Sequence, residues 1–257
     1  MLIAQVRSQT AYRASFVIAL VGAAAFTALD MVTVIVLFHV TSTLGGFAFR
    51  PAFLMASIAG LGFALADLMC GNVERLSDLI RRGQLDALLV RPLGPLRQVL
   101  VSEFQPRQAG RVVETAIALV IAARLAGEPH SLSGVLLLVV APLAGAVFFG
   151  SVFVISATIA FWWIDSGEFA NGFTYGGRDF TTYPMTVYGS IFRRAFAFGL
   201  GFAFVSYYPT LAILGQRDPL GLPRWAGWIS PLVALAAAGI AALVWRTGVR
   251  HYRSTGS

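Results

Sequence analysis

The chain has 257 residues, of which 57% are hydrophobic and only 12% charged, with a net charge of +7. About one-quarter of the residues in soluble domains are charged, so this composition excludes an ordinary water-soluble globule, and its hydrophobicity excludes disorder; it predicts a polytopic membrane protein. Every basic residue is an arginine, so the chain lacks the lysine with which a P-loop grips nucleotide phosphates.

Six apolar segments are candidate membrane spans, since about 20 such residues cross the hydrocarbon core of a bilayer, and the third of them is short. We therefore expect an all-α protein that forms one transmembrane domain over residues 1–257. The expected spans are residues 14–40, 52–70, 112–126, 132–163, 195–214 and 225–245.

Arginine placement predicts how these spans are oriented. With the N-terminus inside, the cytoplasmic segments hold every arginine except Arg50, Arg124, Arg217 and Arg224. Because cytoplasmic loops of membrane proteins are enriched in basic residues, both termini are expected inside. The positive charge is thus mainly an orientation signal, and no nucleic-acid partner is expected.

The longest polar stretch is the cytoplasmic loop expected over residues 71–110. Val73, Leu76, Leu79 and Ile80 recur at three- and four-residue spacing, which predicts an amphipathic helix. We expect Gly83 to end it, since glycine suits the left-handed conformation found after many helices.

A second short helix over residues 84–90 is expected to stop before Pro92. Two roles fit this loop. It lies on the inner leaflet with its arginines on anionic lipid, or it docks a cytoplasmic protein. Glu74 and Asp78 favour docking, because a helix that faces only anionic lipid gains nothing from acidic residues.

Part of this loop resembles a known family. From Arg81 to Leu93 it reads Arg-Arg-Gly-Gln-Leu-Asp-Ala-Leu-Leu-Val-Arg-Pro-Leu, which is similar to the loop signature of bacterial permeases in the ATP-binding-cassette (ABC) type-2 exporter superfamily. Tyr207-Tyr208-Pro209 and the closing Tyr252-Arg253-Ser254-Thr255-Gly256 resemble later landmarks of that family. Six spans with both termini inside agree with it.

The resemblance implies half of an exporter in the bacterial inner membrane. A second permease, identical or a sister chain, would complete the pathway, and two copies of a separate ATPase would bind ATP and magnesium, leaving no cofactor in this chain. The loop helix would be the coupling helix, which transmits motion from the ATPase to the spans. The implied coupling residues are Arg81, Arg82, Gly83, Asp86, Arg91 and Pro92.

Three residues are candidates for lining a pathway. Asp30 lies within the first expected span, where a charged side chain is costly unless it faces protein or water. It either contacts substrate or forms a structural hydrogen bond to a neighbouring helix. Phe202 and Tyr207 lie on the fifth expected span.

The remaining polar residues predict structure rather than chemistry. Asp67 and Glu114 are expected near the inner ends of spans, where Glu114 is close enough to Arg111 to pair. Three scattered histidines and the single cysteine, Cys70, make no metal site. The glycine-rich segment 164–194 is expected along the inner face, as a candidate second contact with the ATPase.

Two other classes of membrane protein are possible readings of the sequence. A membrane enzyme lacks support, because no mid-span histidine and no cytoplasmic aspartate cluster is found. An ion-coupled secondary transporter or channel is the remaining alternative, although residues 1–126 and 127–257 show no convincing repeat. The substrate is not indicated by the sequence.

Overall fold

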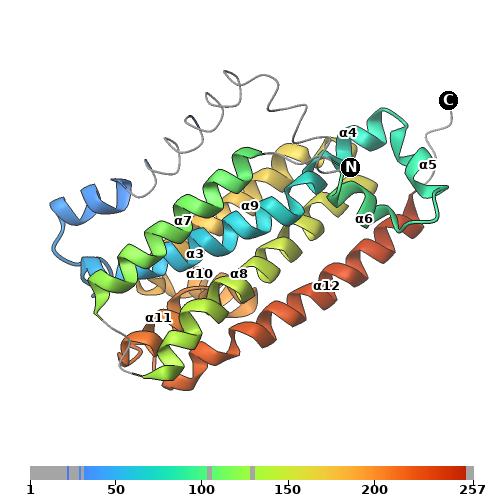
Figure 1. The fold of residues 1–257 in the computed structure, drawn as a ribbon. Coiled ribbons are helices and arrows are strands. Elements are labelled where there is room, and N and C mark those ends of the chain that lie inside the picture. The colour runs from blue at the N-terminus through green and yellow to red at the C-terminus, as the bar shows by residue number, and fades with distance from the viewer. Residues whose placement is uncertain (1–21, 23–28, 30–31, 103–105, 128–130, 253–257) are drawn as a thin grey trace.

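The computed structural model describes residues 22, 29, 32–102, 106–127 and 131–252. In these ranges the chain is helical, apart from connecting turns and an isolated antiparallel bridge between Leu44 and Phe47. Figure 1 shows an elongated bundle of long helices with several short helices gathered at one end. The all-α class is confirmed for the described residues.

Two long helices form the centre of the bundle. α3 (Phe49–Cys70) and α8 (Leu132–Thr158) pack along each other, α7 (Pro106–Ala126) covers α3, and α12 (Ser230–His251) covers α8 (Figure 1). A Cβ atom on Gly62 of α3 would lie 3.2 Å from the Cα of Gly145 of α8. The two glycines therefore let the backbones meet without a side chain between them.

The described residues contain three helices that are long and apolar enough to cross a membrane. They are Phe49–Arg81, Leu132–Phe161 and Arg224–His251, and they include or closely match the predicted spans 52–70, 132–163 and 225–245. α7 begins at Pro106, earlier than the predicted 112–126. Of the first predicted span only residues 22, 29 and 32–40 are described, and all of them are helical.

The outward faces of α7 and α12 carry large apolar side chains, as expected of helices that meet lipid or another membrane helix. The exposed residues include Val113, Ile117, Val120, Leu232, Leu235 and Leu243.

The predicted span 195–214 is wrong as a single helix. Ser190–Gly199 and Phe202–Leu214 are two helical pieces that meet at a bend of 67°. The first comprises α10 (Ser190–Phe192) and a π-helix over Arg193–Gly199; the second comprises a 3-10 turn over Phe202–Phe204 and α11 (Tyr207–Leu214). Gly201 between them has φ +85°, a conformation that other residues rarely adopt, so the bend is built on this glycine.

The segment 164–194 also differs from its prediction along the inner face. The 3-10 turn η3 (Ile164–Ser166) leads into α9 (Gly167–Thr182), which packs along both α3 and α8. The fully buried residues of α9 are small, Ala170, Thr174, Gly177 and Thr181, so it approaches its neighbours closely, and the ring of Tyr175 packs against Phe63 of α3.

Contacts near the end of α9 show how far the segment runs. Arg178, which the sequence placed in the cytoplasm, lies with its guanidinium carbon 5.4 Å from the ring centre of Phe63 on α3. After α9, the Thr186 hydroxyl donates to the Gly45 carbonyl (2.6 Å), in the connection that precedes α3. The segment therefore runs along the bundle instead of lying across its end.

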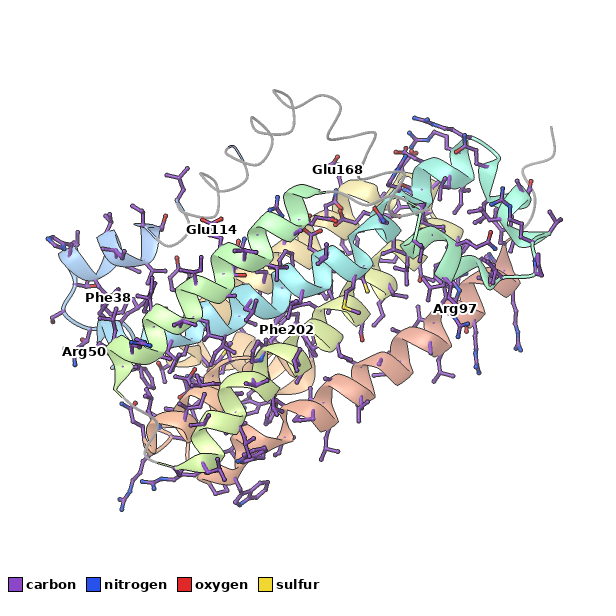
Figure 2. The ribbon with its side chains drawn as sticks, in the orientation of Figure 1. Phe38, Arg50, Arg97, Glu114, Glu168 and Phe202 are labelled. Carbon is purple, nitrogen blue, oxygen red and sulfur yellow. The ribbon has the colours of Figure 1, made fainter. Side chains whose placement is uncertain are left out.

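Two labelled arginines mark the ends of the bundle. Figure 2 shows Arg50 beside the start of α3, at one end, and Arg97 among the short helices at the other. The sequence assigned these two residues to opposite sides of the membrane, and the fold separates them accordingly along its long axis.

Candidate functional site

The candidate site is the set of short helices at one end of the bundle, between α3 and α7. The 3-10 helix η1 (Gly71–Arg75) continues from α3 and is followed by α4 (Leu76–Arg81), α5 (Gln84–Leu89) and α6 (Pro95–Leu100). In Figure 1 they lie next to the C-terminal end of α12. We refer to residues 71–102 as the loop platform.

The amphipathic pattern of the loop platform is confirmed. Val73, Leu76 and Ile80 are buried in the core cluster that also contains residues of α8, and Leu79 packs against it. The apolar face of the predicted helix is therefore covered by the bundle itself. An inner-leaflet helix would have left that face on lipid.

Gly83 ends α4 as predicted. Its φ is +65°, and its backbone N–H donates to the Ile80 carbonyl (3.0 Å). No atom lies within 4 Å of the place where a Cβ would stand, so backbone conformation alone favours glycine here.

The turn between α5 and α6 is closed by a side chain that the sequence did not single out. The Gln98 amide nitrogen donates to the carbonyls of Leu88 (2.8 Å) and Leu93 (2.6 Å). Because α5 ends at Leu89, before Arg91-Pro92, this amide holds together the two sides of the proline turn. A lone glutamine in a polar stretch offers no sequence signal for such a role.

Asp86 of α5 faces inward instead of outward. Its Oδ1 accepts a hydrogen bond from the hydroxyl of Tyr252 (3.0 Å), the residue directly after α12. Burial, together with the hydrogen bond to Asp86 and the charge of its carboxylate, raises the pKa of Tyr252 above the usual 10.0. The tyrosine is therefore a protonated donor at neutral pH.

Arg81 of α4 also has a partner within the chain. Its guanidinium forms an ion pair with the Asp165 carboxylate of η3 (2.6 Å), and the two side chains are 57% and 78% exposed. The loop platform thus reaches the connection between α8 and α9 on one side and the end of α12 on the other.

The other four predicted coupling residues, Arg82, Gly83, Arg91 and Pro92, are exposed. Two large aliphatic side chains beside the proline turn, Val90 and Leu93, are 85% and 62% exposed. This combination of arginines and aliphatic residues around α5 forms a surface suited to a protein partner, in which apolar contact is rimmed by charge. We call these six residues the docking surface.

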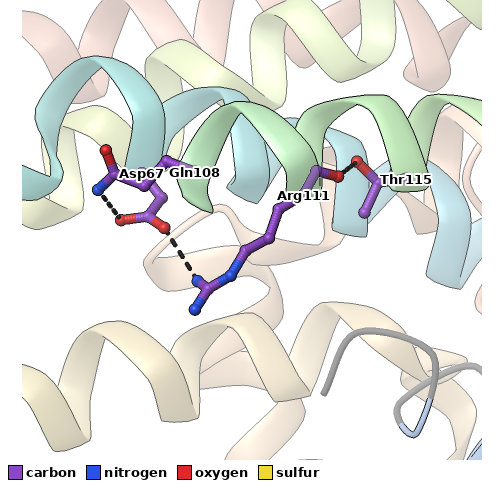
Figure 3. Close-up of polar contacts among 4 residues, drawn as sticks. All are labelled: Asp67, Gln108, Arg111 and Thr115. Atoms are coloured by element: carbon purple, nitrogen blue, oxygen red, sulfur yellow. Dashed lines mark hydrogen bonds and ion pairs between the residues drawn. The ribbon is translucent and has the colours of Figure 1, made fainter. Parts of the chain in front are cut away.

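A buried polar cluster anchors the base of the loop platform (Figure 3). Asp67 of α3 accepts from the side-chain nitrogens of Gln108 and Arg111 of α7, each at 3.0 Å. A Cβ on Gly71 would collide with both Asp67 and Gln108. The sequence anticipated a structural role for Asp67, but not that Arg111 would reach across to it.

The three predicted pathway residues are placed unequally. Phe202, labelled in Figure 2, is buried. Its ring centre lies 5.0 Å from that of Phe148. Tyr207 is buried and donates its hydroxyl to Asp218 (2.9 Å), in the connection after α11. Asp30 lies outside the described residues. A pathway role for the three stays a prediction.

No group of three or more histidine, cysteine, aspartate or glutamate residues placed to hold a metal ion occurs in the described part of the chain.

Comparison with known proteins gives one match. The family model described as "ABC-2 family transporter protein" matches residues 24–256. No curated protein and no solved structure matched the chain.

Proposed function

The chain belongs to the ABC-2 family of transporter proteins, and we propose that it is the permease subunit of an exporter driven by a separate ABC ATPase. It forms half of the translocation pathway and pairs with a second permease, identical or a sister chain, in the bacterial inner membrane. Two ATPase copies supply the ATP and magnesium sites. The lack of lysine, and hence of a P-loop, supports this division of labour.

The proposed topology keeps six spans with both termini inside, but it assigns the fifth to α9. The spans are then residues 14–40, α3, α7, α8, α9 and α12, and the bent pair 190–214 enters from the outer side and returns there. The hydrogen bond from Thr186 to Gly45 supports this, because Gly45 precedes α3. Arg193 and Arg194 move outside, while the loop platform and the end of α12 keep an inside excess of arginine.

The observation that carries the proposal is the docking surface on a folded platform. Its arginines and aliphatic residues are exposed around α5, while the apolar side of α4 is packed into the bundle. A partner pressing on this surface therefore pushes on a rigid element that continues directly from α3. A loop lying on lipid would offer no such connection.

The proposal is tested by co-expression and co-purification with a candidate ABC ATPase from the same genome. Arg82→Glu combined with Arg91→Glu reverses the charge of the docking surface, and we expect retention of the ATPase to fall at least about tenfold, as when like charges meet across an interface. Arg97→Glu is the matched control, since Arg97 is exposed on the same platform but outside the docking surface. Equal retention by all variants would contradict the proposed docking.

A transport assay separates the exporter from the ion-coupled alternative. With the permease and the ATPase in inside-out vesicles, we expect uptake that requires ATP and continues after the ion gradients are collapsed. Uptake that proceeds without the ATPase and stops when the gradients collapse would favour the secondary transporter. A panel of fluorescent amphiphiles serves as the probe, because the substrate class is open.

A further inference from the structure

The inner end of α12 is fixed to α8 by close packing. A Cβ on Gly248 would lie 2.6 Å from a methyl carbon of Thr158, so α12 approaches α8 closely at this point. The ring of Phe161, just beyond α8, packs edge-on against Trp245 (5.4 Å between ring centres) and Tyr252 (5.9 Å). Movement of Tyr252 is therefore transmitted to α12 and to the end of α8 together.

Tyr252 also carries the hydrogen bond that joins this end of α12 to the loop platform. The bond spans 166 residues of sequence, and its acceptor is the Asp86 carboxylate of α5. Hydrogen bonds to ionised groups are roughly twice as strong as those between neutral groups. Both residues are half-buried, so water competes less for this bond than at a fully exposed site.

The second link of the platform has a different character. Arg81 and Asp165 are more than half exposed, and such ion pairs are weak and screened by salt. Compared with the Arg81–Asp165 pair, the link through Tyr252 is thus the better placed to transmit movement.

We propose that Tyr252 is a positioning residue that locks α5 to α12, so that displacement of the docking surface by the ATPase moves α12 with it. This inference rests on the proposed function and deepens it. Tyr252, the residue after the last helix, then has a role in coupling. Asp86 becomes an internal partner within the coupling helix instead of a residue that contacts the ATPase.

Tyr252→Phe tests the lock, because it removes the hydroxyl and keeps the ring that packs on Phe161. The experiment uses the full chain with its ATPase in lipid nanodiscs, with Cys70→Ala and spin labels on cysteines at Arg97 of α6 and Arg246 of α12. Both label positions are exposed. Electron-spin distances are recorded without nucleotide and with ATP, magnesium and vanadate.

With Tyr252 present, we expect the Arg97–Arg246 distance distribution to stay the same in both states, because the platform and α12 move together. In Tyr252→Phe it should broaden or shift when nucleotide binds. The population of locked platform should fall about tenfold, the size expected for loss of a hydrogen bond to a charged group. Permease-dependent ATP hydrolysis should change with it, while ATPase retention stays unchanged.

Two controls make the result specific. Asp86→Ala should also release the platform, and the effect of the double variant should be smaller than the sum of the two single effects, since both substitutions remove the same bond. Tyr188→Phe, at a tyrosine remote from the platform in sequence and element, should behave as the wild type.

If the distances in Tyr252→Phe match those of the wild type in both states, the lock is overturned. If the wild-type chain does not retain an ATPase at all, the proposed function fails instead, which is a separate and distinguishable result.

Discussion

The loop platform and the segment from η3 to α11 lie at the two sides of α8 in sequence and are held in different ways. The platform buries one stripe of large aliphatic residues and is also joined to the rest of the bundle by side-chain contacts from Arg81 and Asp86. Most of its charged residues lie at the surface, but Asn72 is buried and donates to the Leu100 carbonyl (3.0 Å) within the platform. The platform is a small folded unit held by aliphatic packing and polar contacts.

The segment from η3 to α11 instead fits into the bundle through small residues and aromatic rings. Gly177 of α9 meets the ring of Phe202, and Phe192 and Phe196 stack with their ring centres 4.3 Å apart. Close packing of this kind tolerates little change in volume. We therefore expect substitutions in and around the platform to change stability by removing single polar contacts. In the segment from η3 to α11, we expect them to change stability by altering side-chain volume.

The largest effect is expected at the buried ion pair below the platform. Arg111→Ala removes the guanidinium that pairs with the Asp67 carboxylate, whose side chain is 6% exposed. Removing one member of a buried pair costs about 3–5 kcal/mol. The loss is measured as a lower free energy of unfolding in detergent. Adding Asp67→Asn should recover part of it, and an Arg111→Ala variant as stable as the wild type would contradict the pairing.

A smaller loss of stability is expected when a glycine of α9 is replaced by a larger residue. In Gly177→Val, the new Cβ would stand 2.9 Å from two ring carbons of Phe202, and overpacking of this kind costs about 1–3 kcal/mol. Thermal unfolding of the purified protein measures the loss. Gly176→Val is the matched control, since no atom lies within 4 Å of its Cβ position. Equal losses in the two variants would argue against close packing of α9.

A still smaller and local effect is expected at the end of α4. Gly83→Ala meets no neighbouring atom, but it places a side chain at φ +65°, which costs about 1–2 kcal/mol. Hydrogen exchange should become faster in the amides of α4 and α5. Gly94→Ala, at φ −55°, should leave exchange unchanged. Protection unaltered by Gly83→Ala would mean that the turn is not held in the left-handed conformation.

The smallest effect is expected at the exposed ion pair. Arg81→Gln should lower stability by less than about 1 kcal/mol, and the difference should vanish at high salt. Melting temperatures at low and high sodium chloride measure it. Arg82→Gln, at the neighbouring exposed arginine, gives the baseline for losing one surface charge. A loss that persists in high salt would show that the pair is shielded from solvent.

Prediction from sequence succeeded where apolar residues differ sharply in hydropathy from the residues around them. The spans around α3, α8 and α12 are long uninterrupted apolar runs, and Val73, Leu76 and Ile80 stand out against charged neighbours. It failed for α9, because the residues that this helix buries are alanine, threonine and glycine, which hydrophobic patterns do not distinguish from a polar connector.

For a related reason, the sequence did not predict the bend at Gly201. Residues 195–214 are apolar throughout, so hydropathy favours one straight helix. Glycine is also common in continuous membrane helices. Only the neighbours of Gly201, Val233 and Phe148, show that the chain turns there against α12 and α8.

The sequence by itself determined that this is a helical membrane protein, where its most apolar helices lie, and that a charged amphipathic loop with a glycine-ended helix follows the second of them. These properties depend on composition and on local periodicity, which neighbouring residues fix among themselves. Only the tertiary structure decided that Arg111 pairs with Asp67, that α9 packs along both α3 and α8, and that Tyr252 donates a hydrogen bond to Asp86. Such contacts join residues far apart in the chain. They depend on which helices pack together and at which positions along their length, and a local sequence pattern does not indicate this.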